Sequence, residues 1–419
     1  MKTLKQLWEL VKSQKLYTFI YILGTALALA SVTVYAVQIH TKIAPVYPEK
    51  NRMRMAMVPQ VKLEMPNYFT SISSLSLSAV KTYLWDIPAA DDKTALYSDW
   101  EKKTAQSQTG GEDPVVQRNG VDEGFFRIFD LDFLAGAPLT ADDLAAHERK
   151  ALIDSYTARK IFGALEPREI LGREFTIDYM PYRVAGVFRP MSEALPVSFA
   201  NVLVPYTTIA DYDEVDREML GNFEVIYLTD DIGAIRNELK NVETRFNTSH
   251  DNLIVDFMGL PLGSTEYIFN RGSAQNEFVL SDVLITILFT FLVLLLIPAL
   301  NLSGMVAGRM EGRLPELGVR KTYGARPAAL LRGLLWENLI LTIVGGMLGF
   351  FMAWLLLTTG VMGVDTLRGD NVSASSGMVF APAVFAFCFV VCLILNLLSA
   401  LLPAWKALRR PIVESLKEK

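Results

Sequence analysis

The chain has 419 residues, of which 51% are hydrophobic, and a formal net charge of −5. This composition is too apolar for an ordinary soluble protein and predicts membrane-spanning segments. Residues 39–278 hold 36 acidic and 24 basic side chains, whereas the rest of the chain holds 9 and 16. An apolar, basic part and a polar, acidic part are typical of a membrane anchor with a solvated domain. Nucleic-acid binding is not expected, because the acidic part has no basic patch with interleaved aromatic residues.

The chain begins with an amphipathic pattern that is followed by a long apolar run. In residues 1–15, apolar side chains recur at helical spacing among lysines, which predicts a cytoplasmic amphipathic helix in the membrane interface. Residues 16–39 carry no charge and are numerous enough to cross about 30 Å of hydrocarbon. A cleavable signal peptide would have a shorter apolar core, whereas this run continues to His40. We therefore expect a retained first span and a cytoplasmic N-terminus.

Residues 40–277 contain no spanning segment, and we expect them to form an α+β domain outside the membrane. Alternating apolar residues predict strands, and apolar residues three or four apart predict helices. The expected elements are a strand over 57–65, a helix over 71–83, a loop over 103–120, a strand over 223–229, a helix over 232–246 and a strand over 252–257. Because strand and helix patterns occur at both ends, we predict one small lobe with a second lobe inserted in its sequence.

The predicted inserted lobe is marked by four stretches rich in apolar residues and glycine: 124–139, 150–163, 170–177 and 182–188. The last two predict a pair of strands joined by a turn. Apolar and glycine positions of this kind serve packing and turns, so we assign them no catalytic role.

Further apolar segments predict three more spans, which gives four transmembrane helices in all. We expect the second span with its stalk at 278–307, a cytoplasmic loop at 308–333, the third span at 334–362, a short outer loop at 363–378, the fourth span at 379–404 and a basic tail at 405–419. Pro403 is expected to end the fourth span. Both termini and the central loop are placed in the cytoplasm, because they are rich in basic residues.

Small and polar residues in the predicted spans indicate close packing between helices. Pro298 should bend the second span, and Asn301 can hydrogen-bond to a neighbouring helix. In the third span, Gly345 and Gly349 form a small-xxx-small pair, which permits close helix contact.

The loop between the second and third spans predicts a short helix with a cap at each end. Pro315 suits the first helical turn, where its missing N–H is no loss, and Glu316 complements the positive end of the helix dipole. Arg320 and Lys321 fall in the last turn, and Gly324 provides a C-cap. A basic loop that only sets topology is the alternative, but such a loop needs no shaped helix.

Residue patterns for catalysis and metal binding are not found. The sequence contains no G-x-x-x-x-G-K-[ST] motif, so we do not expect this chain to bind ATP by that route. His40, His147 and His250 lack metal-ligand spacing, and Cys388 and Cys392 lie in an apolar run that makes a poor metal site. We therefore predict no catalytic residue, no metal and no cofactor bound by this chain.

Three parts of the sequence resemble one family. The central motif PELGVRKTYGA at 315–325, the four stretches of the inserted lobe and the C-terminal PAWKALRRPIVESLK at 403–417 are similar to those of MacB/FtsX-type ABC transporter permeases. The resemblance covers nearly the whole chain and implies a MacB-like periplasmic core domain with an FtsX-like membrane domain. It also implies that the central helix is a coupling helix that docks into a nucleotide-binding subunit. The implied docking positions are Pro315, Glu316, Leu317, Gly318, Arg320, Lys321 and Gly324.

The function implied by this resemblance is that of a non-catalytic permease subunit in the bacterial inner membrane. It would transmit the ATP-driven motion of a separate ATPase subunit to its periplasmic domain, for export or extraction of a substrate. Implied partners are the ABC ATPase, which binds the ATP, a second permease copy or paralogue, membrane lipids, and a periplasmic adaptor or outer-membrane protein. The alternative is a membrane-anchored sensor or scaffold without transport activity, which predicts no stable ATPase partner. Ion-coupled transport is disfavoured by only four spans without a buried charge pair.

Overall fold

The computed structural model describes residues 15–99, 101–107, 110–193, 195–210, 212, 219–250, 252–270, 279–312, 319, 322–358 and 382–409. These residues form two compact units. The helix unit contains the described residues of 15–40, 280–358 and 382–409, and the strand unit contains those of 41–279. The amphipathic helix predicted at 1–15 lies outside the described residues, apart from Lys15.

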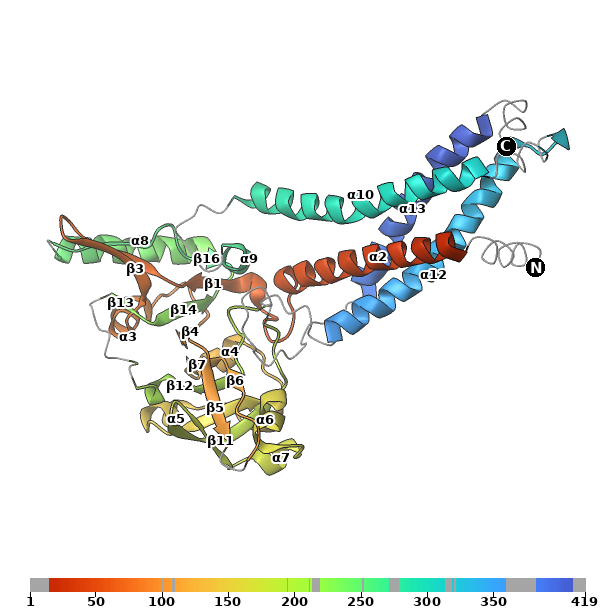
Figure 1. The fold of residues 1–419 in the computed structure, drawn as a ribbon. Coiled ribbons are helices and arrows are strands. Elements are labelled where there is room, and N and C mark those ends of the chain that lie inside the picture. Colours follow the sequence, from red (N-terminus) through yellow and green to blue (C-terminus); the bar gives the residue numbers. More distant parts are fainter. Residues whose placement is uncertain are drawn as a thin grey trace. The chain divides into compact units, whose positions relative to one another are not determined.

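Four long helices are found in the described part of the helix unit (Figure 1): α2 (Lys15–Ile43), α10 (Leu280–Gly312), α12 (Pro327–Thr358) and α13 (Pro382–Arg409). Three of them contain stretches long and apolar enough to cross a membrane, namely Lys15–Ile43, Ala328–Leu357 and Pro382–Trp405. In α10 the described apolar stretch, Leu280–Leu296, is shorter. Three candidate spans are therefore found among the described residues, and the fourth stays a prediction.

The ends of α12 and α13 differ from the predicted spans. α12 begins at Pro327, where the fixed φ of proline suits a first helical turn and its missing N–H is no loss. α13 continues through Pro403 to Arg409, so the prediction that Pro403 ends the helix is wrong. A proline inside a helix removes one hydrogen bond, which membrane helices tolerate where neighbouring groups compensate. Pro403 is half-buried, and Ala404 beside it is buried.

The strands of the strand unit fall into two groups along the sequence. The first lobe contains β1 (Met55–Val58), β2 (Val61–Met65), β3 (Phe69–Leu75), β4 (Asp92–Ser98), β13 (Leu220–Gly221), β14 (Phe223–Leu228), β15 (Ile254–Asp256) and β16 (Leu262–Gly263). The inserted lobe contains β5 (Lys103–Ser107), β6 (Val115–Val116), β7 (Arg118–Val121), β8 (Phe133–Gly136), β9 (Lys150–Asp154), β10 (Glu174–Ile177), β11 (Met180–Phe188) and β12 (Val202–Pro205).

Helical segments accompany both lobes (Figure 1). Those of the first lobe are η1 (Arg52–Arg54), α3 (Leu77–Ala79), η2 (Val80–Leu84), α8 (Ile232–Ser249) and α9 (Ser264–Phe269). Those of the inserted lobe are α4 (Phe125–Ile128), α5 (Ala141–Ala145), α6 (Ser155–Phe162), α7 (Pro167–Ile170) and η3 (Tyr206–Thr208).

The two lobes share one hydrogen-bonded strand order, β15-β2-β3-β14-β4-β7-β12-β9-β11-β10-β5-β6. They join where β4 pairs with β7, with Tyr97 opposite Gly120 and Ser98 opposite Asn119. The pairs β7–β12 and β9–β11 are parallel, and the other neighbours in this order are antiparallel. The inserted lobe is therefore continuous with the sheet of the first lobe.

The core of the first lobe includes buried residues of β14 and α8. Every residue of β14 is buried. The buried residues of α8 recur at helical spacing and form one apolar stripe: Ile235, Leu239, Val242 and Phe246. The carboxylate of Asp231 caps the helix by accepting a hydrogen bond from the Ala234 amide at 3.0 Å. The predicted strand at 223–229 and the predicted helix at 232–246 are confirmed.

Three other predicted elements differ from the structure. The helix expected over 71–83 is half wrong, because Phe69–Leu75 forms β3 and the helical segments α3 and η2 follow it. The loop expected over 103–120 is confirmed only for residues 110–114, since β5, β6 and β7 occupy most of this range. β3 and β5 are rich in polar residues, so their apolar residues do not alternate clearly enough to predict a strand. They are strands because β3 pairs with β2 and β5 pairs with β10. The strand predicted over 57–65 is divided at Pro59 into β1 and β2.

Candidate functional site

In the described helix unit, α12 packs closely against α2 at the two predicted packing glycines. A Cβ atom added to Gly345 would lie 2.9 Å from the Cβ of Thr25 and 3.0 Å from the carbonyl oxygen of Ile22. At Gly349 it would lie 2.7 Å from the carbonyl oxygen of Ala26. Side chains larger than hydrogen therefore do not fit, and the two backbones touch directly. We call this contact the glycine seam.

Two further contacts extend the glycine seam. A Cβ atom on Gly346 would collide with the ring of Phe389, so α12 also lies close to α13 on its other side. One turn earlier, the hydroxyl groups of Tyr21 and Thr342 share a buried hydrogen bond of 3.1 Å between α2 and α12. Such bonds and small residues hold membrane helices together, since lipid is as apolar as their side chains. Gly345 and Gly349 thus lie in a packed interface, whereas the side chain of Asn301 lies outside the described part.

The last turn of α2 is held by an ion pair buried in the strand unit, which we call the Glu49–Arg52 clamp. Arg52 donates from Nε to Glu49 Oε2 at 2.8 Å and from Nη1 to the carbonyl oxygen of Thr41 at 2.8 Å. The exposed fractions of the two side chains are 0% for Glu49 and 1% for Arg52. The carbonyl of Thr41 belongs to the last turn of a helix, where carbonyl groups lack intrahelical donors, and Arg52 supplies that donor.

The Glu49–Arg52 clamp also reaches the inserted lobe. The hydroxyl of Ser198, between β11 and β12, donates to Glu49 Oε1 at 2.7 Å. The clamp therefore connects the end of α2, the segment before β1 and the inserted lobe through one buried carboxylate. This clamp was not predicted from the sequence. Opposite charges three residues apart were a visible signal, but nothing in the sequence shows that both would be buried.

A second buried carboxyl group lies in the first lobe. Glu224 of β14 accepts a hydrogen bond of 2.8 Å from the hydroxyl of Tyr267 in α9. Burial raises the pKa of Glu224 to about 7, and the hydrogen bond from Tyr267 opposes this only in part. This side chain is therefore largely protonated in mildly acidic solution.

The predicted coupling segment is only partly described. Pro315, Glu316, Leu317, Gly318, Arg320 and Lys321 lie outside the described residues. At its end, the amide of Tyr323 donates to the carbonyl oxygen of Val319 at 3.2 Å, and Gly324 has a φ of +85°. This is the left-handed conformation of a helix C-cap, which glycine adopts without strain. Gly324 thus closes one helical turn shortly before α12 begins.

Among the described residues, no group of three or more histidine, cysteine, aspartate or glutamate side chains is placed to hold a metal ion. Cys388 and Cys392 are free thiols buried in α13.

Two protein-family models match this chain over most of its length. Residues 18–242 match the MacB-like periplasmic core domain, and residues 282–412 match the FtsX-like permease C-terminal domain. Among curated proteins, the macrolide export ATP-binding/permease protein MacB of Shewanella oneidensis is 24% identical over 338 residues, 80% of this chain and 47% of that protein. The protein of the same name from Agrobacterium fabrum is 23% identical over 373 residues, 83% of this chain and 53% of that protein. The chain spans about half the length of these relatives.

Solved structures of extracytoplasmic domains are also similar. The periplasmic region of MacB from Actinobacillus actinomycetemcomitans is 18% identical, with a TM-score of 0.35, and the match covers 53% of this chain and 94% of that one. The extracellular domain of the ABC-type transporter YknZ from Gram-positive bacteria is 19% identical, with a TM-score of 0.34, and the match covers 47% of this chain and 99% of that one.

Proposed function

The chain belongs to the MacB/FtsX family of ABC transporter permeases, and on this premise we propose how it works. It is the membrane subunit that passes the ATP-driven motion of a separate ATPase subunit to its periplasmic domain. ATP is bound and hydrolysed by the partner, and this chain contributes no catalytic residue. The work done by the motion is the export or extraction of a substrate.

The observation that carries this proposal is the glycine seam. Because α12 contributes only hydrogen atoms at Gly345 and Gly349, it has no flexible side chain there that could absorb a displacement relative to α2. α12 begins at Pro327, three residues after the turn that Gly324 closes. A displacement of the coupling segment is therefore carried by α12 to α2.

The Glu49–Arg52 clamp supplies the next step of the proposed route. Arg52 holds the last turn of α2 through the Thr41 carbonyl, and Glu49 is bound in turn by Ser198 of the inserted lobe. A buried, hydrogen-bonded ion pair is a stiff connection, because separating its charges in the protein interior costs several kcal/mol. Motion of α2 along its axis thus reaches both lobes.

The proposed assembly contains two permease copies or paralogues in the bacterial inner membrane, with the ATPase in the cytoplasm. A periplasmic adaptor or outer-membrane protein completes it. The curated relatives are named as macrolide export proteins, so macrolides are the first substrates to test for efflux.

The test is purification of the full-length protein in mild detergent, scored for a co-purifying ATPase. We expect an ATPase with the unchanged protein and its loss when Glu316, Arg320 and Lys321 are all replaced by Ala. Replacing Glu238 and Lys240 of α8 by Ala is the matched control, which should retain the ATPase. A well-folded protein that retains no ATPase would contradict the proposal and favour the sensor or scaffold function.

A further inference from the structure

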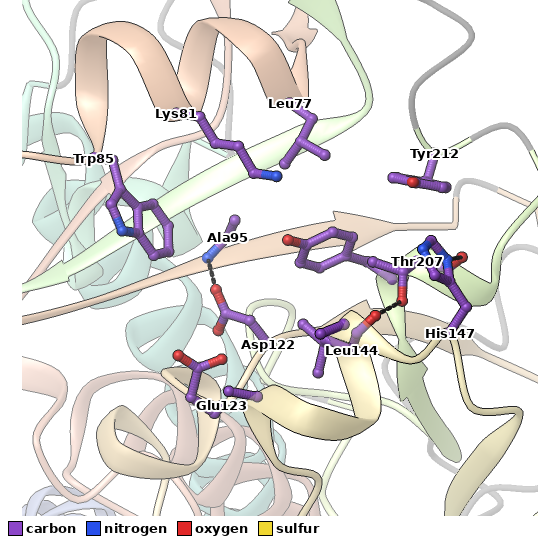
Figure 2. A pocket seen from close by; sticks show the side chains of 13 residues that line it. Leu77, Lys81, Trp85, Ala95, Asp122, Glu123, Leu144, His147, Thr207 and Tyr212 are labelled. Carbon is purple, nitrogen blue, oxygen red and sulfur yellow. Dashed lines mark hydrogen bonds between the residues drawn. The ribbon is translucent and has the colours of Figure 1, made fainter.

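A pocket of about 530 Å³ opens in the strand unit between its two lobes (Figure 2). One wall comes from the first lobe, with Lys81 and Trp85 on and after η2. The other wall comes from the inserted lobe, with Glu123 before α4 and His147 after α5. A molecule bound here touches both lobes. The volume is within the range of about 300–1,000 Å³ that is usual for small-molecule sites.

Two opposite charges line this pocket without neutralising each other. Figure 2 shows the Lys81 side chain extending into the pocket from one wall, with the Glu123 carboxylate on the opposite side. Neither group has an ion pair or hydrogen bond with any other residue that the structure describes. A cation and an anion held apart in this way can each bind a ligand group of the opposite sign.

Asp122, the neighbour of Glu123, serves the fold instead. Its carboxylate accepts hydrogen bonds from the Thr94 hydroxyl at 2.6 Å and from the amides of Ala95 and Phe125 at 3.0 and 3.1 Å. Both of its oxygens are therefore occupied, and its side chain is buried. Glu123 is thus the carboxylate available to a ligand.

Aromatic rings provide the apolar part of the pocket. Tyr206 and Tyr212 pack with their ring centroids 6.0 Å apart, and Tyr206 also meets Phe223 edge-on at 5.3 Å. The ring of Trp85 is held by the ammonium group of Lys93, which lies 5.1 Å from its centroid. These contacts fix the rings, and the hydroxyl of Tyr206 has no hydrogen-bond partner among the described residues. Rigid aromatic walls with a few convergent polar groups are typical of ligand sites.

We propose that this pocket binds a short zwitterionic peptide with apolar side chains. The ammonium group of the peptide binds Glu123, its carboxylate binds Lys81, and its side chains pack between Trp85 and the two tyrosines. A purely cationic ligand would leave Lys81 unused, and a purely anionic ligand would leave Glu123 unused. This proposal is independent of the transport function and concerns binding alone.

The probe is the dipeptide leucyl-phenylalanine, titrated by calorimetry into the purified full-length protein in detergent. We expect saturable binding with a Kd below about 1 mM. The N-acetyl dipeptide, which has lost its ammonium group, and the C-terminal amide, which has lost its carboxylate, should each bind about tenfold more weakly or worse.

Variants assign each charge to its partner. Glu123→Gln should weaken binding of the free dipeptide about tenfold, and this variant should bind the N-acetyl and free forms equally well. Lys81→Met should also weaken binding of the free dipeptide about tenfold, and it should bind the amide and free forms equally well. Lys240→Met, on the exposed side of α8, is the control that should change nothing, and thermal unfolding shows whether each variant is folded. The proposal would be overturned if the unchanged protein bound all three peptides equally well. It would also be overturned if no binding were detected up to roughly 10 mM peptide, a very weak affinity.

Discussion

In the helix unit, α12 meets α2 through glycines, so that backbone touches backbone, whereas in the strand unit β14 is enclosed by large apolar side chains. The difference follows from the solvent around each region. Burying a large apolar side chain stabilises a domain in water, by roughly 1.5–3 kcal/mol each. The same burial contributes little between helices in lipid, where close van der Waals contact replaces it.

The two regions also treat charge differently. The strand unit buries the Glu49–Arg52 clamp and the carboxyl group of Glu224. In the described part of the helix unit, the buried polar side chains are uncharged: Thr18, Thr25, Thr33, Asn338, Thr342 and Asn396. The helix unit is therefore joined through a backbone contact, and the strand unit through a buried charge pair. The following predictions test this contrast, beginning with the largest effect.

Removing one member of the Glu49–Arg52 clamp should cause the greatest loss. Arg52→Met leaves Glu49 buried without its counter-ion, which we expect to lower the free energy of unfolding by about 3–5 kcal/mol. The matched control is Arg183→Met, since the Arg183 side chain is 68% exposed, and it should change stability by less than about 0.5 kcal/mol. Denaturant unfolding followed by circular dichroism measures both. A loss below about 1 kcal/mol for Arg52→Met would show that the pair does not hold the end of α2.

Filling the glycine seam should be nearly as costly. Gly349→Leu forces α2 and α12 apart and should destabilise the helix unit by about 3 kcal/mol, near the upper end for overpacking. Gly333→Leu lies in the same helix, where a Cβ would meet nothing within 4 Å among the described atoms, so it is the control. Thermal unfolding in detergent measures the stability of each variant. The ATP hydrolysis rate of the co-purified ATPase then measures coupling. Equal behaviour of the two variants would mean that the seam is not a tight contact.

The buried carboxyl group of Glu224 makes stability depend on pH. Its pKa is about 7 in the folded protein and 4.5 when unperturbed, so the folded state favours the protonated form. The resulting stabilisation is fully present below about pH 4.5, is lost as the pH rises through about 7, and amounts to about 3 kcal/mol. Glu224→Gln keeps an acceptor for Tyr267 and should remove this slope. The test is to measure the free energy of unfolding of both proteins at several pH values. If it changed with pH equally in the unchanged protein and in Glu224→Gln, the raised pKa would not belong to Glu224.

The smallest effect is expected at Gly324. Its φ of +85° suits glycine, so Gly324→Ala should destabilise this helical turn by about 1 kcal/mol. Gly324→Asn should destabilise it less, because asparagine adopts the left-handed conformation more readily than alanine. Hydrogen exchange at the Tyr323 amide and the yield of co-purified ATPase measure this change. Unaltered exchange in the alanine variant would show that the C-cap is not important for this turn.

The sequence predicted well those elements whose signal is local. The helix at 232–246 has an apolar stripe and a cap in its own sequence, and α2 has an uncharged run long enough for a span. Gly345 and Gly349 were expected to pack, and they lie against α2. The C-cap expected at Gly324 has the required backbone conformation.

Features that depend on distant partners could not be predicted in this way. β3 and β5 are strands because β2 and β10 pair with them, and their own serine and glutamine residues gave a weak period. The Glu49–Arg52 clamp depends on Ser198, which is 149 residues from Glu49. The pocket likewise brings Lys81 and Glu123 together from different lobes. Pairings of this kind are set by tertiary contacts, on which the local pattern is silent.

The join between the lobes has a consequence for how such proteins diversify. β7 lies between β4, the last strand before the insertion, and β12, the last strand within it. The strands nearest the two ends of the insertion, β4 and β12, are therefore separated by a single strand of the same sheet. An insertion whose ends belong to the same sheet can be lengthened, shortened or exchanged without redesign of the host, because the host's own pairs, such as β14 with β4, are untouched. Grafting the inserted lobe of a relative onto this chain between β4 and β13 should therefore give a folded chimaera, with a new surface on an unchanged first lobe.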